Sequence, residues 1–574
     1  MSVLLVVLVA STAAYVDPPP AVSRVHHRSI SLGFDPRVSL TVHPKAVEGN
    51  VSELVQVAWE GLPASWSDAW IGLYLDGEDS TSVVPLKYQF CNASAASGNR
   101  SAGKLAFRLF NYRADAVFRL FAGWDRPRLL AESPSVLIRR PSFPTGLRLA
   151  LTATPGEVAI TWSSAALHRT VARVEYEVVA VEGVIERRGT SYASNSTYGR
   201  GEMCGAPANA EGFREPGTFY TARITTLTSG AWVRYRAGSE EAWSGWRSFR
   251  TPPSAGAPVK ILAFGDLGQM PHDESMQADG TPWYTQEFAR GDPGAPNTTA
   301  ALLADHSKEP ADAVLHNGDL SYAMGYSAEW EAFHDQIEPL SSVIPWMITM
   351  GNHERDWPGT GSLPGMADSL GECGVPTIRR FPAMPFSSHQ LPPHDEPWYA
   401  LQLGVVTLLV ISTEHSLSPG SVQHRFLERA LAEIDRTQTP WVLLAGHRPY
   451  HISSVWEGDE EFARAFRADV GPLIEDKVDL LLGAHHHSYQ RTCALQEGAC
   501  KPGGMVVVNL GMAGAGLNLA NETRPPIFRH VDDQHFGYCR ITANSTDLAL
   551  EYVRSDDRKV HDRVSLSKAE VVVM

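Results

Sequence analysis

The stretch VKILAFGDLG, residues 259–268, is a short apolar run that ends in a glycine and an aspartate. Four further runs have the same form, with a glycine and then a polar side chain after the apolar residues: DAVLHNGDLSYA (312–323), PWMITMGNHE (345–354), PWVLLAGHRP (440–449) and VDLLLGAHHHSY (478–489). Segments with helical periodicity lie between the runs, and strands that alternate with helices form layered α/β domains. Because open α/β sheets collect functional side chains at the carboxyl ends of their strands, the five runs predict a single pocket.

The polar side chains that follow these runs are of types that bind metal ions. They are Asp266, Asp319, Tyr322, Asn352, His447, His485 and His487. Oxygen and imidazole groups suit hard and borderline cations, and a carboxylate such as Asp319 can bridge two ions. Two such ions can activate water and bind phosphate oxygens, so the pattern predicts two-metal phosphoester hydrolysis. Each motif alone is more often a turn, a capped loop or a solvent-facing histidine, but five in fixed order favour a metal centre.

The length and charge of the chain restrict its class. A chain of 574 residues is too long for one core, so two to four domains are expected. It carries 64 acidic and 49 basic residues, a net charge of −15, whereas a nucleic-acid-binding surface needs a basic stripe. We expect small phosphorylated substrates and no nucleic acid as a stable partner. No later apolar run reaches the roughly 18 residues that span a bilayer, so no membrane span is predicted. The sequence does not indicate the oligomeric state.

Three domains are predicted from the change in periodicity along the chain. Residues 36–140 contain runs of alternating apolar and polar residues, which favour a β-sandwich. Residues 144–253 form a second β block that resembles a fibronectin type III module. After the Pro/Gly/Ser linker at 251–260, residues 258–563 alternate strands and helices, which predicts an α/β layered domain. Within it, the Gly- and Pro-rich interval 355–397 is typical of a surface loop at a functional rim.

The N-terminus and the sequons indicate a secreted glycoprotein. Residues 1–14 are apolar and end in small residues, as in a cleaved signal peptide, although their first residues include no Lys or Arg. N-linked glycans are expected at seven sequons: Asn50, Asn92, Asn99, Asn195, Asn297, Asn521 and Asn544. Of the six cysteines, Cys493 and Cys500 can close a small disulfide loop, and the other pairings stay open. The predicted location is extracellular, in the cell wall or in the vacuole.

The motif order resembles that of the purple acid phosphatases, within the metallophosphoesterase superfamily. The motifs are Gly265-Asp266-Leu267-Gly268, Gly318-Asp319-Leu320-Ser321-Tyr322, Gly351-Asn352-His353-Glu354, His447 and His485-His486-His487. The resemblance extends over roughly residues 36–563 and is closest to the large plant-type members. It implies a metallophosphoesterase domain with an Fe(III) ion and a divalent ion, Zn, Mn or Fe. The Fe(III) ligands it implies are Asp266, Asp319, Tyr322 and His487, and the divalent-ion ligands are Asp319, Asn352, His447 and His485.

Two histidines outside the ligand set are candidate catalytic residues. His353 follows Asn352 directly and is the better candidate to protonate the leaving alkoxide. His451, four residues after His447, is the second, and an ordinary loop histidine is about equally compatible with the sequence. Relatives often carry a His pair further along this loop, but the corresponding ISSVWEGD (452–459) has none, so substrate contacts are expected to differ.

Two positions depart from the family pattern. Leu444 stands where valine is usual, and we expect no cost because both are apolar strand residues. Ala484 stands where glycine is usual, and it would strain the loop if that position needs a positive φ.

Three functions remain compatible with the sequence. The first is a secreted acid phosphatase that hydrolyses phosphate monoesters with a metal-bound hydroxide. The second is a nucleotide pyrophosphatase or phosphodiesterase that uses the same site. The third is a binding glycoprotein with weak or lost catalysis. The complete set of seven ligand types favours an enzyme over the third alternative.

Overall fold

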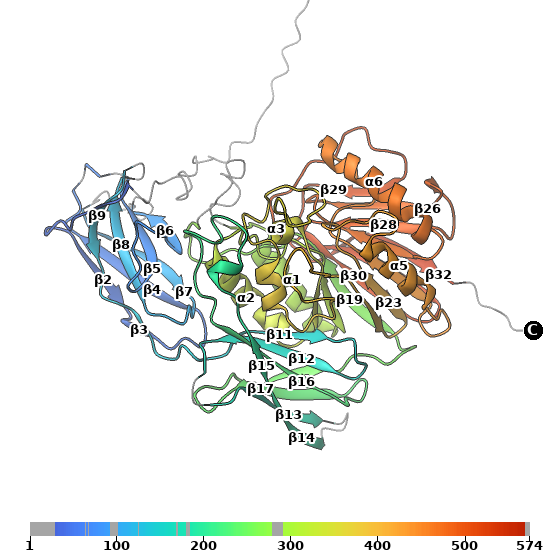
Figure 1. The fold of residues 1–574 in the computed structure, drawn as a ribbon, viewed down its shortest axis with the longest axis horizontal. Coiled ribbons are helices and arrows are strands. Elements are labelled where there is room, and N and C mark those ends of the chain that lie inside the picture. The colour runs from blue at the N-terminus through green and yellow to red at the C-terminus, as the bar shows by residue number, and fades with distance from the viewer. Residues whose placement is uncertain are drawn as a thin grey trace, which may run out of the picture.

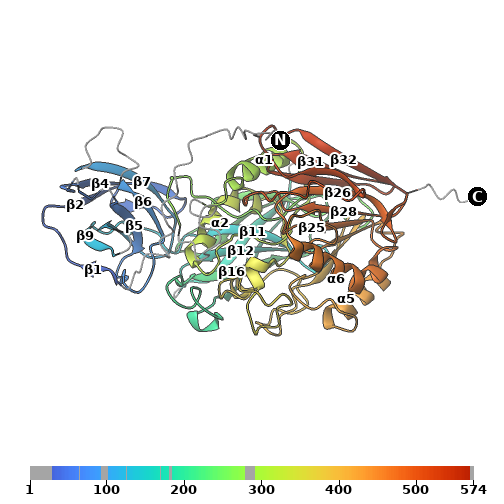
Figure 2. The same ribbon diagram turned by 90° about the horizontal axis from the view of Figure 1, so that it is seen from above.

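The computed structural model describes residues 29–568 apart from 64, 67, 92–100, 124–125, 168–169, 180–183 and 278–290. The predicted signal segment 1–14 and the sequons at Asn92 and Asn99 lie outside the described residues. Two β modules precede a larger α/β domain (Figure 1), so the predicted multidomain fold class is confirmed. Seen from above, the first module lies at one end of the molecule, and helices α5 and α6 lie toward the other (Figure 2).

The first module is a sandwich of two main sheets, ordered β1-β9-β8-β5-β6 and β2-β4-β7, with a short β10-β3 pair. Its strands are β1 (Ser31–Leu32), β2 (Ser39–His43), β3 (Ala46–Val47), β4 (Glu53–Glu60), β5 (Trp70–Leu75), β6 (Lys87–Phe90), β7 (Gly103–Leu109), β8 (Ala116–Ala122), β9 (Arg128–Glu132) and β10 (Leu137–Ile138). Side chains on β4 point alternately to the two faces of its sheet, and Val55, Val57 and Trp59 are buried while their neighbours are not. These three residues therefore lie on the face that packs inside the sandwich.

The second module is also a sandwich, of sheets β11-β12-β16-β15 and β14-β13-β17-β18. Its strands are β11 (Thr145–Leu151), β12 (Val158–Ser164), β13 (Arg173–Val179), β14 (Ile185–Tyr192), β15 (Ser194–Ser196), β16 (Thr218–Ile224), β17 (Trp232–Gly238) and β18 (Arg247–Arg250), and a 3-10 turn, η4, spans Arg200–Glu202. Trp162 of β12 and Tyr235 of β17 are fully buried between the sheets. β11 packs against helix α2 (Ser327–Ser341), which joins this module to the α/β domain.

The α/β domain contains two sheets with helices on the outside. The first is ordered β21-β20-β19-β30-β31-β32, and the second β22-β23-β24-β25-β28-β26-β27, with β29 paired to β26. The strands are β19 (Val259–Phe264), β20 (Ala313–His316), β21 (Trp346–Ile348), β22 (Tyr399–Leu403), β23 (Val406–Val410), β24 (Trp441–Ala445), β25 (Leu480–Gly483), β26 (Tyr489–Gln496), β27 (Ala499–Cys500), β28 (Met505–Leu510), β29 (Phe528–Asp532), β30 (Gly537–Ala543), β31 (Asp547–Arg554) and β32 (Val560–Ser567). The other helices are α1 (Ala295–Lys308), α3 (Asn352–Arg355), α4 (Val375–Arg380), α5 (Val422–Ala432) and α6 (Glu457–Ile474).

The five quoted runs lie in two sheets. β19, β20 and β21 are parallel neighbours in the first sheet, and β24 and β25 are parallel neighbours in the second. Side chains alternate along β24: Leu443 and Ala445 face the core shared by both sheets, whereas Val442 and Leu444 face α5 and α6. Apolar residues on both faces of a strand do not reveal which sheet it joins, which is why the sequence did not separate the two sheets.

The interval 355–397 is not simply a surface loop. It contains α4 and is held at both ends, because Arg355 Nε lies 2.8 Å from Asp395 Oδ2 and both side chains are buried. The disulfide Cys204–Cys373 ties the same interval to the second module. The segment is therefore held in place, and its Asp368 contacts Asn352 after the carboxyl end of β21.

A buried carboxyl group in this segment makes stability depend on pH. Glu372 accepts hydrogen bonds from Gly325 N and Trp330 Nε1, both at 3.1 Å, and burial raises its pKa from 4.5 to about 7. Between these values the unfolded chain releases a proton that the folded protein keeps, so the free energy of unfolding falls as pH rises. Between about pH 4.5 and 7, we expect the free energy of unfolding of the wild type to fall by up to about 3 kcal/mol relative to that of Glu372→Gln. Urea unfolding of both proteins across this range checks it, and parallel profiles would contradict it.

The structure describes most of the cysteines and sequons that the sequence singled out. The structure joins Cys493 to Cys500, as expected, and the side chains of Cys91 and Cys539 are buried. Asn50, Asn195, Asn297, Asn521 and Asn544 are all exposed. Within the described ranges, no helix is long and apolar enough to cross a membrane.

Candidate metal centre

All seven predicted ligand side chains stand where a strand of the α/β domain has just ended. Asp266 follows β19, Asp319 and Tyr322 follow β20, and Asn352 opens α3 after β21. His447 follows β24, and His485 and His487 follow β25. Both sheets present these carboxyl ends to the same place, so residues more than two hundred positions apart meet in space.

The backbone at four of these residues is in the left-handed region, with φ of 58° at Asp266, 48° at Asp319, 50° at Tyr322 and 69° at His485. Non-glycine residues seldom adopt positive φ, and such strain is concentrated at functional sites. The turns are therefore bent to bring the side chains inward at a cost in backbone energy, which packing of the two sheets must offset.

Close packing of the turns explains two of the motif glycines. A Cβ on Gly351 would lie 2.2 Å from Asp319 Oδ1, and one on Gly265 would lie 2.5 Å from the Cβ of Ala484. The expected strain at Ala484 is absent, because the positive φ falls on His485 instead. Ala484 is fully buried against Gly265 and is accommodated without a left-handed backbone.

The first group of ligands surrounds Tyr322. Its hydroxyl lies 3.2 Å from Asp266 Oδ1 and 2.9 Å from His487 Nε2. His487 Nδ1 is 2.6 Å from the Gly516 carbonyl, which leaves Nε2 to face the pocket. Asp266, Tyr322 and His487 are buried or nearly so.

The second group surrounds the Asn352 amide oxygen. His447 Nε2 lies 3.0 Å from Asn352 Oδ1, and His485 Nδ1 lies 2.9 Å from it. His447 Nδ1 is 2.9 Å from the Asn317 carbonyl, so its Nε2 is directed inward. Asn352 Nδ2 donates to Asp368 Oδ2 at 2.9 Å, which fixes the amide so that its oxygen faces the histidines.

Asp319 lies between the two groups and belongs to both. Its carboxylate is within 4.8 Å of the ligand atoms of His447 and His485 on one side and of Asp266 and His487 on the other. Oδ2 is buried without a well-formed hydrogen bond in the described part of the chain, and His447 Nε2 lies 3.3 Å away. An under-satisfied buried carboxylate oxygen among inward-facing nitrogen and oxygen atoms fits two bound cations that share Asp319.

The electrostatics of the pocket lead to the same interpretation. Burial disfavours the charged form of His447, but the carboxylates of Asp319 and Asp266 outweigh it and raise its pKa to about 10. Burial likewise opposes the charge of His487, while its hydrogen bond to Asp266 raises its pKa to about 9. The two carboxylates thus stabilise positive charge at the two positions where the ligand atoms converge.

His353 lies inside the pocket beside Asp319. Its backbone N donates to Asp319 Oδ1 at 3.1 Å, and its ring Nε2 is 3.9 Å from Asp319 Oδ2. Its Nδ1 is 3.2 Å from the Asp368 carbonyl, and its ring centroid is 4.7 Å from that of Tyr322. The imidazole is therefore oriented and close to the reacting region.

His451, the other predicted catalytic residue, is directed elsewhere. Its ring packs edge-on against Tyr450 at 5.2 Å, and no ligand side chain is among its described contacts. Burial and the charge of Arg467 lower its pKa to about 3. Its described contacts do not bring His451 to the ligand side chains, and its acid role stays a prediction.

Further side chains hold the ligand residues in place. Glu354 accepts from the backbone N atoms of Gly351, Asp319 and Leu320, and so fixes two ligand turns with one carboxylate. Arg448 joins Glu414 and Asp356 to the outer edge of the pocket, with its NH1 3.2 Å from His485 Nε2. Glu354 ends the quoted GNHE motif and Arg448 follows His447, but the sequence does not show which groups they contact.

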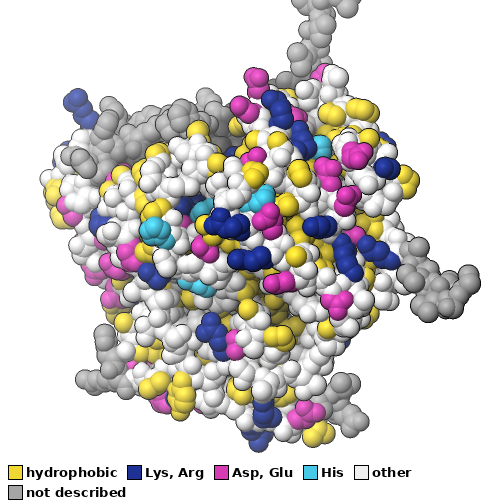
Figure 3. All heavy atoms as spheres, turned by 45° about the vertical axis from the view of Figure 1, so that its right-hand side comes forward, with side chains coloured by type: hydrophobic (Ala, Val, Ile, Leu, Met, Phe, Trp, Pro, Cys, Tyr) yellow, Lys and Arg dark blue, Asp and Glu magenta, His cyan; other side chains and the backbone are white. Residues whose placement is uncertain are grey.

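The pocket opens to solvent on the side of His485 and His487, which are 19% and 10% exposed. Figure 3 shows one face of the molecule, on which histidine side chains lie among acidic and basic ones.

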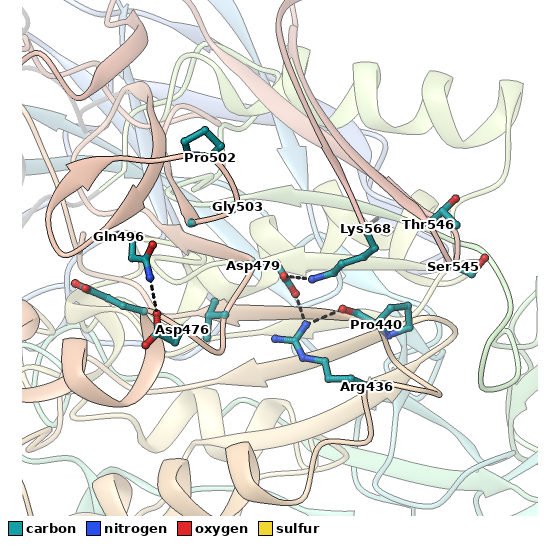
Figure 4. Close-up of a pocket in the computed structure, with 13 residues that line it drawn as sticks. Arg436, Pro440, Asp476, Asp479, Gln496, Pro502, Gly503, Ser545, Thr546 and Lys568 are labelled. Atoms are coloured by element: carbon teal, nitrogen blue, oxygen red, sulfur yellow. Dashed lines mark hydrogen bonds and ion pairs between the residues drawn. The ribbon is translucent and has the colours of Figure 1, made fainter. Parts of the chain in front are cut away.

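A separate hollow of about 930 Å³ lies at the amino ends of β24 and β25 (Figure 4). In this hollow, Asp479 forms ion pairs of 2.5 Å with both Arg436 and Lys568, so both basic groups are paired. None of the seven ligand side chains lines the hollow.

Family models match most of the chain. Residues 259–489 match calcineurin-like phosphoesterase, and residues 504–563 match iron/zinc purple acid phosphatase-like protein C. Residues 144–251 match the N-terminal domain of purple acid phosphatase, and residues 38–139 match the Fn3-like domain from purple acid phosphatase. Both β modules therefore match domains of purple acid phosphatases, and the model that matches the first module is the one described as Fn3-like.

Two similar proteins align with nearly the whole chain, and a third aligns with part of it. A "Probable inactive purple acid phosphatase" from Arabidopsis thaliana is 33% identical, over 96% of this chain and 92% of that one. A "Nucleotide pyrophosphatase/phosphodiesterase" from Hordeum vulgare is 33% identical over 57% of this chain and 88% of its own. A solved purple acid phosphatase from yellow lupin seeds superposes with a TM-score of 0.84 at 30% identity, covering 93% of this chain and 97% of that one. The chain therefore belongs to the purple acid phosphatase family.

Proposed function

We propose that this protein hydrolyses phosphate monoesters with a pair of metal ions, one Fe(III) and one divalent ion, Zn, Mn or Fe. The observation that carries the proposal is the convergence of all seven ligand side chains around the shared carboxylate of Asp319. Asp266, Tyr322 and His487 would hold Fe(III) with Asp319, and Asn352, His447 and His485 would hold the divalent ion with it. When bound, the ions supply Lewis acidity and an activated water.

The protein's own residues position and complete this chemistry. Glu354 and Asp368 hold Asp319 and Asn352 in place through hydrogen bonds, so that the ligand atoms need little rearrangement. His353, beside Asp319, is placed to bind a phosphate oxygen or to protonate the leaving alkoxide. Burial of the pocket strengthens each of these electrostatic interactions.

Two alternatives need separate tests. The Arabidopsis relative is named probable inactive, which favours a binding protein, but none of the seven ligand types is missing here. The Hordeum relative is named for pyrophosphatase and phosphodiesterase activity, and the same ions could serve those bonds. Assaying the purified protein on monoesters, diesters and pyrophosphates, with metal analysis of the same sample, separates the three. A metal-loaded protein without turnover on any monoester would contradict the proposal.

We further propose that the protein is secreted and glycosylated. The apolar segment 1–14 and the exposed positions of five sequons support this. N-terminal sequencing of protein from the culture medium should begin near residue 15, and glycosidase treatment should lower its mass. A cell-retained protein that keeps residues 1–14 would contradict the proposal.

Tyr322 gives a spectroscopic test of the iron position. A phenolate bound to Fe(III) produces a broad charge-transfer band, so the pure iron-loaded protein should be coloured. Tyr322→Phe should remove the band while the fold persists, because the change removes the hydroxyl beside Asp266 and His487 and keeps the buried ring. A visible-absorption spectrum of both proteins at matched iron content checks this. An iron-loaded wild type without the band would contradict the role of Tyr322.

A further inference from the structure

A cavity of about 530 Å³ lies where the two β modules meet helix α2. The first module contributes the turn between β3 and β4 and the end of β7, and the second contributes the start of β11 and Arg247 of β18. Helix α2 contributes Glu331, His334, Asp335 and Glu338, which share one helix face. The elements β7, β11 and α2 can be followed to this junction in Figure 1. Cavities of about 300–1,000 Å³ hold organic ligands, so this one has room for a ring-sized group.

One wall of the cavity carries the N-glycosylation sequon Asn-Val-Ser that begins at Asn50. The chain is held on both sides of this asparagine. Before it, Asn111 Nδ2 donates to the Gly49 carbonyl at 3.0 Å. After it, Ser52 Oγ donates to Asp335 Oδ2 of α2 at 3.0 Å. The position of Asn50 beside the cavity is therefore set by hydrogen bonds to two separate parts of the fold.

The Asn50 side chain itself is exposed and makes no hydrogen bond to the described part of the chain. Its amide nitrogen is therefore free to carry a sugar at the edge of the cavity. The next residue, Val51, is 61% exposed, and Phe110 also lines the cavity, so the first module offers apolar surface there.

The opposite wall offers polar groups. Arg247 NH2 and Glu338 Oε1 lie 3.7 Å apart, and both side chains are partly exposed. Atoms at this separation form no hydrogen bond with each other, so the guanidinium can donate toward the cavity and the carboxylate can accept from it. N-acetylglucosamine has an apolar face of C–H groups and a rim of hydroxyl and acetamide groups. Its chemistry therefore matches the two walls.

We propose that the first N-acetylglucosamine of a glycan on Asn50 occupies this cavity and holds the first module against α2 and the second module. The proposal rests on the proposed glycosylation of a secreted chain. In the transfer, Asn50 Nδ2 loses a proton and bonds to C1 of the sugar, and the diphosphate of a lipid-linked donor leaves. A tethered sugar has an effective concentration of about millimolar at the cavity, so weak contacts suffice to retain it. The fixed sequon also lowers the entropy lost when the sugar is ordered.

The first test measures how accessible the sugar is in the folded protein. Peptide N-glycosidase cuts the bond between an asparagine and its first sugar, and mass spectrometry of peptides gives the extent of release at each site. Asn195 is a matched site, because it is exposed on β15, the edge strand opposite β11 in the same sheet. In the native secreted protein, release from Asn50 should be slower by about 10-fold or more, since the junction must open first. Equal rates at the two sites in the native protein would overturn the proposal.

A change in the far wall tests the place of the sugar without altering the sequon. Arg247→Ala removes a polar partner, so release from Asn50 should become faster by about threefold or more while release from Asn195 stays the same. Arg250→Ala is the control, because it removes an exposed arginine of the same strand that does not line the cavity. An unchanged rate at Asn50 in Arg247→Ala would show that the sugar lies elsewhere.

Hydrogen exchange tests whether the sugar supports the junction. Asn50→Gln prevents attachment and keeps an amide, and the backbone amides of residues 331–338 in α2 should then exchange faster by about fivefold or more. Asn195→Gln should leave these rates unchanged. An endoglycosidase that leaves one N-acetylglucosamine on each asparagine should also leave them unchanged, because the first ring alone fills the cavity. Faster exchange after this trimming, or no effect of Asn50→Gln, would overturn the proposal.

The same mass spectra keep this inference separate from the glycosylation proposal. A sugar on Asn195 and none on Asn50 would overturn the cavity inference while the glycosylation proposal stands. A secreted protein without sugar at any sequon would contradict both.

Discussion

Asp319→Asn is expected to abolish turnover and to lower the content of both metals. The carboxylate of Asp319 lies between two groups of ligand atoms, and its buried Oδ2 has no well-formed hydrogen bond within the described residues. An asparagine amide has one oxygen and no charge, so it cannot serve two cations. Loss of a group that merely supports a ligand typically costs 10–100-fold in metal affinity or activity, and a shared ligand should cost more.

Elemental analysis and turnover of the purified variant measure this effect together. Asp557→Asn is a suitable control, because it makes the same chemical change at an exposed aspartate that accepts a hydrogen bond from Lys559 N. The control should match wild type in both measurements. Unchanged metal content in Asp319→Asn would show that this aspartate is structural and that the pocket is not a shared two-ion site.

His353→Ala is expected to keep both metals and the fold but to reduce turnover by about 10²–10⁴-fold. The ring of His353 faces Asp319 and Tyr322 and takes no part in the two ligand groups. A proton donor matters most for a poor leaving group. The loss should therefore be greatest for alkyl esters and smallest for activated aryl esters such as nitrophenyl phosphate.

His451→Ala provides the matched histidine control. Its ring packs on Tyr450, so its removal should leave the ratio of alkyl to aryl ester turnover unchanged. Equal losses on both ester types in His353→Ala would exclude the acid role and leave phosphate binding. Full activity on both would show that His353 is an ordinary loop residue.

The sequence singled out these seven side chains because each lies one to four residues after a glycine that ends an apolar run. Asp266, Asp319 and His447 are each next to the glycine that ends such a run, so local pattern and spatial position coincide. The division of the strands between two sheets was not predictable, because both faces of a strand such as β24 are apolar in either arrangement.

The supporting residues could not be predicted for a different reason. Asp368 and Asp459 reach Asn352 and His485 from irregular loops, and no periodicity or motif relates those loops to the strands. The pairing of Cys204 with Cys373 joins two domains across 169 positions and depends on how the domains pack. The spacing of His451 from His447 suggested a catalytic role. In the structure, its ring packs against that of Tyr450.

The most direct test of a working two-metal centre is the hydrolysis of a phosphate monoester as a function of measured metal content. Metal-free protein would be loaded stepwise with iron and then with Zn²⁺, and the metal content per chain and the turnover would be determined on the same samples. Six ligands arranged around the shared carboxylate of Asp319 predict little turnover until a second ion binds and full turnover at two ions per chain. Turnover that is complete with one ion per chain, or absent in a folded protein carrying two, would contradict the account.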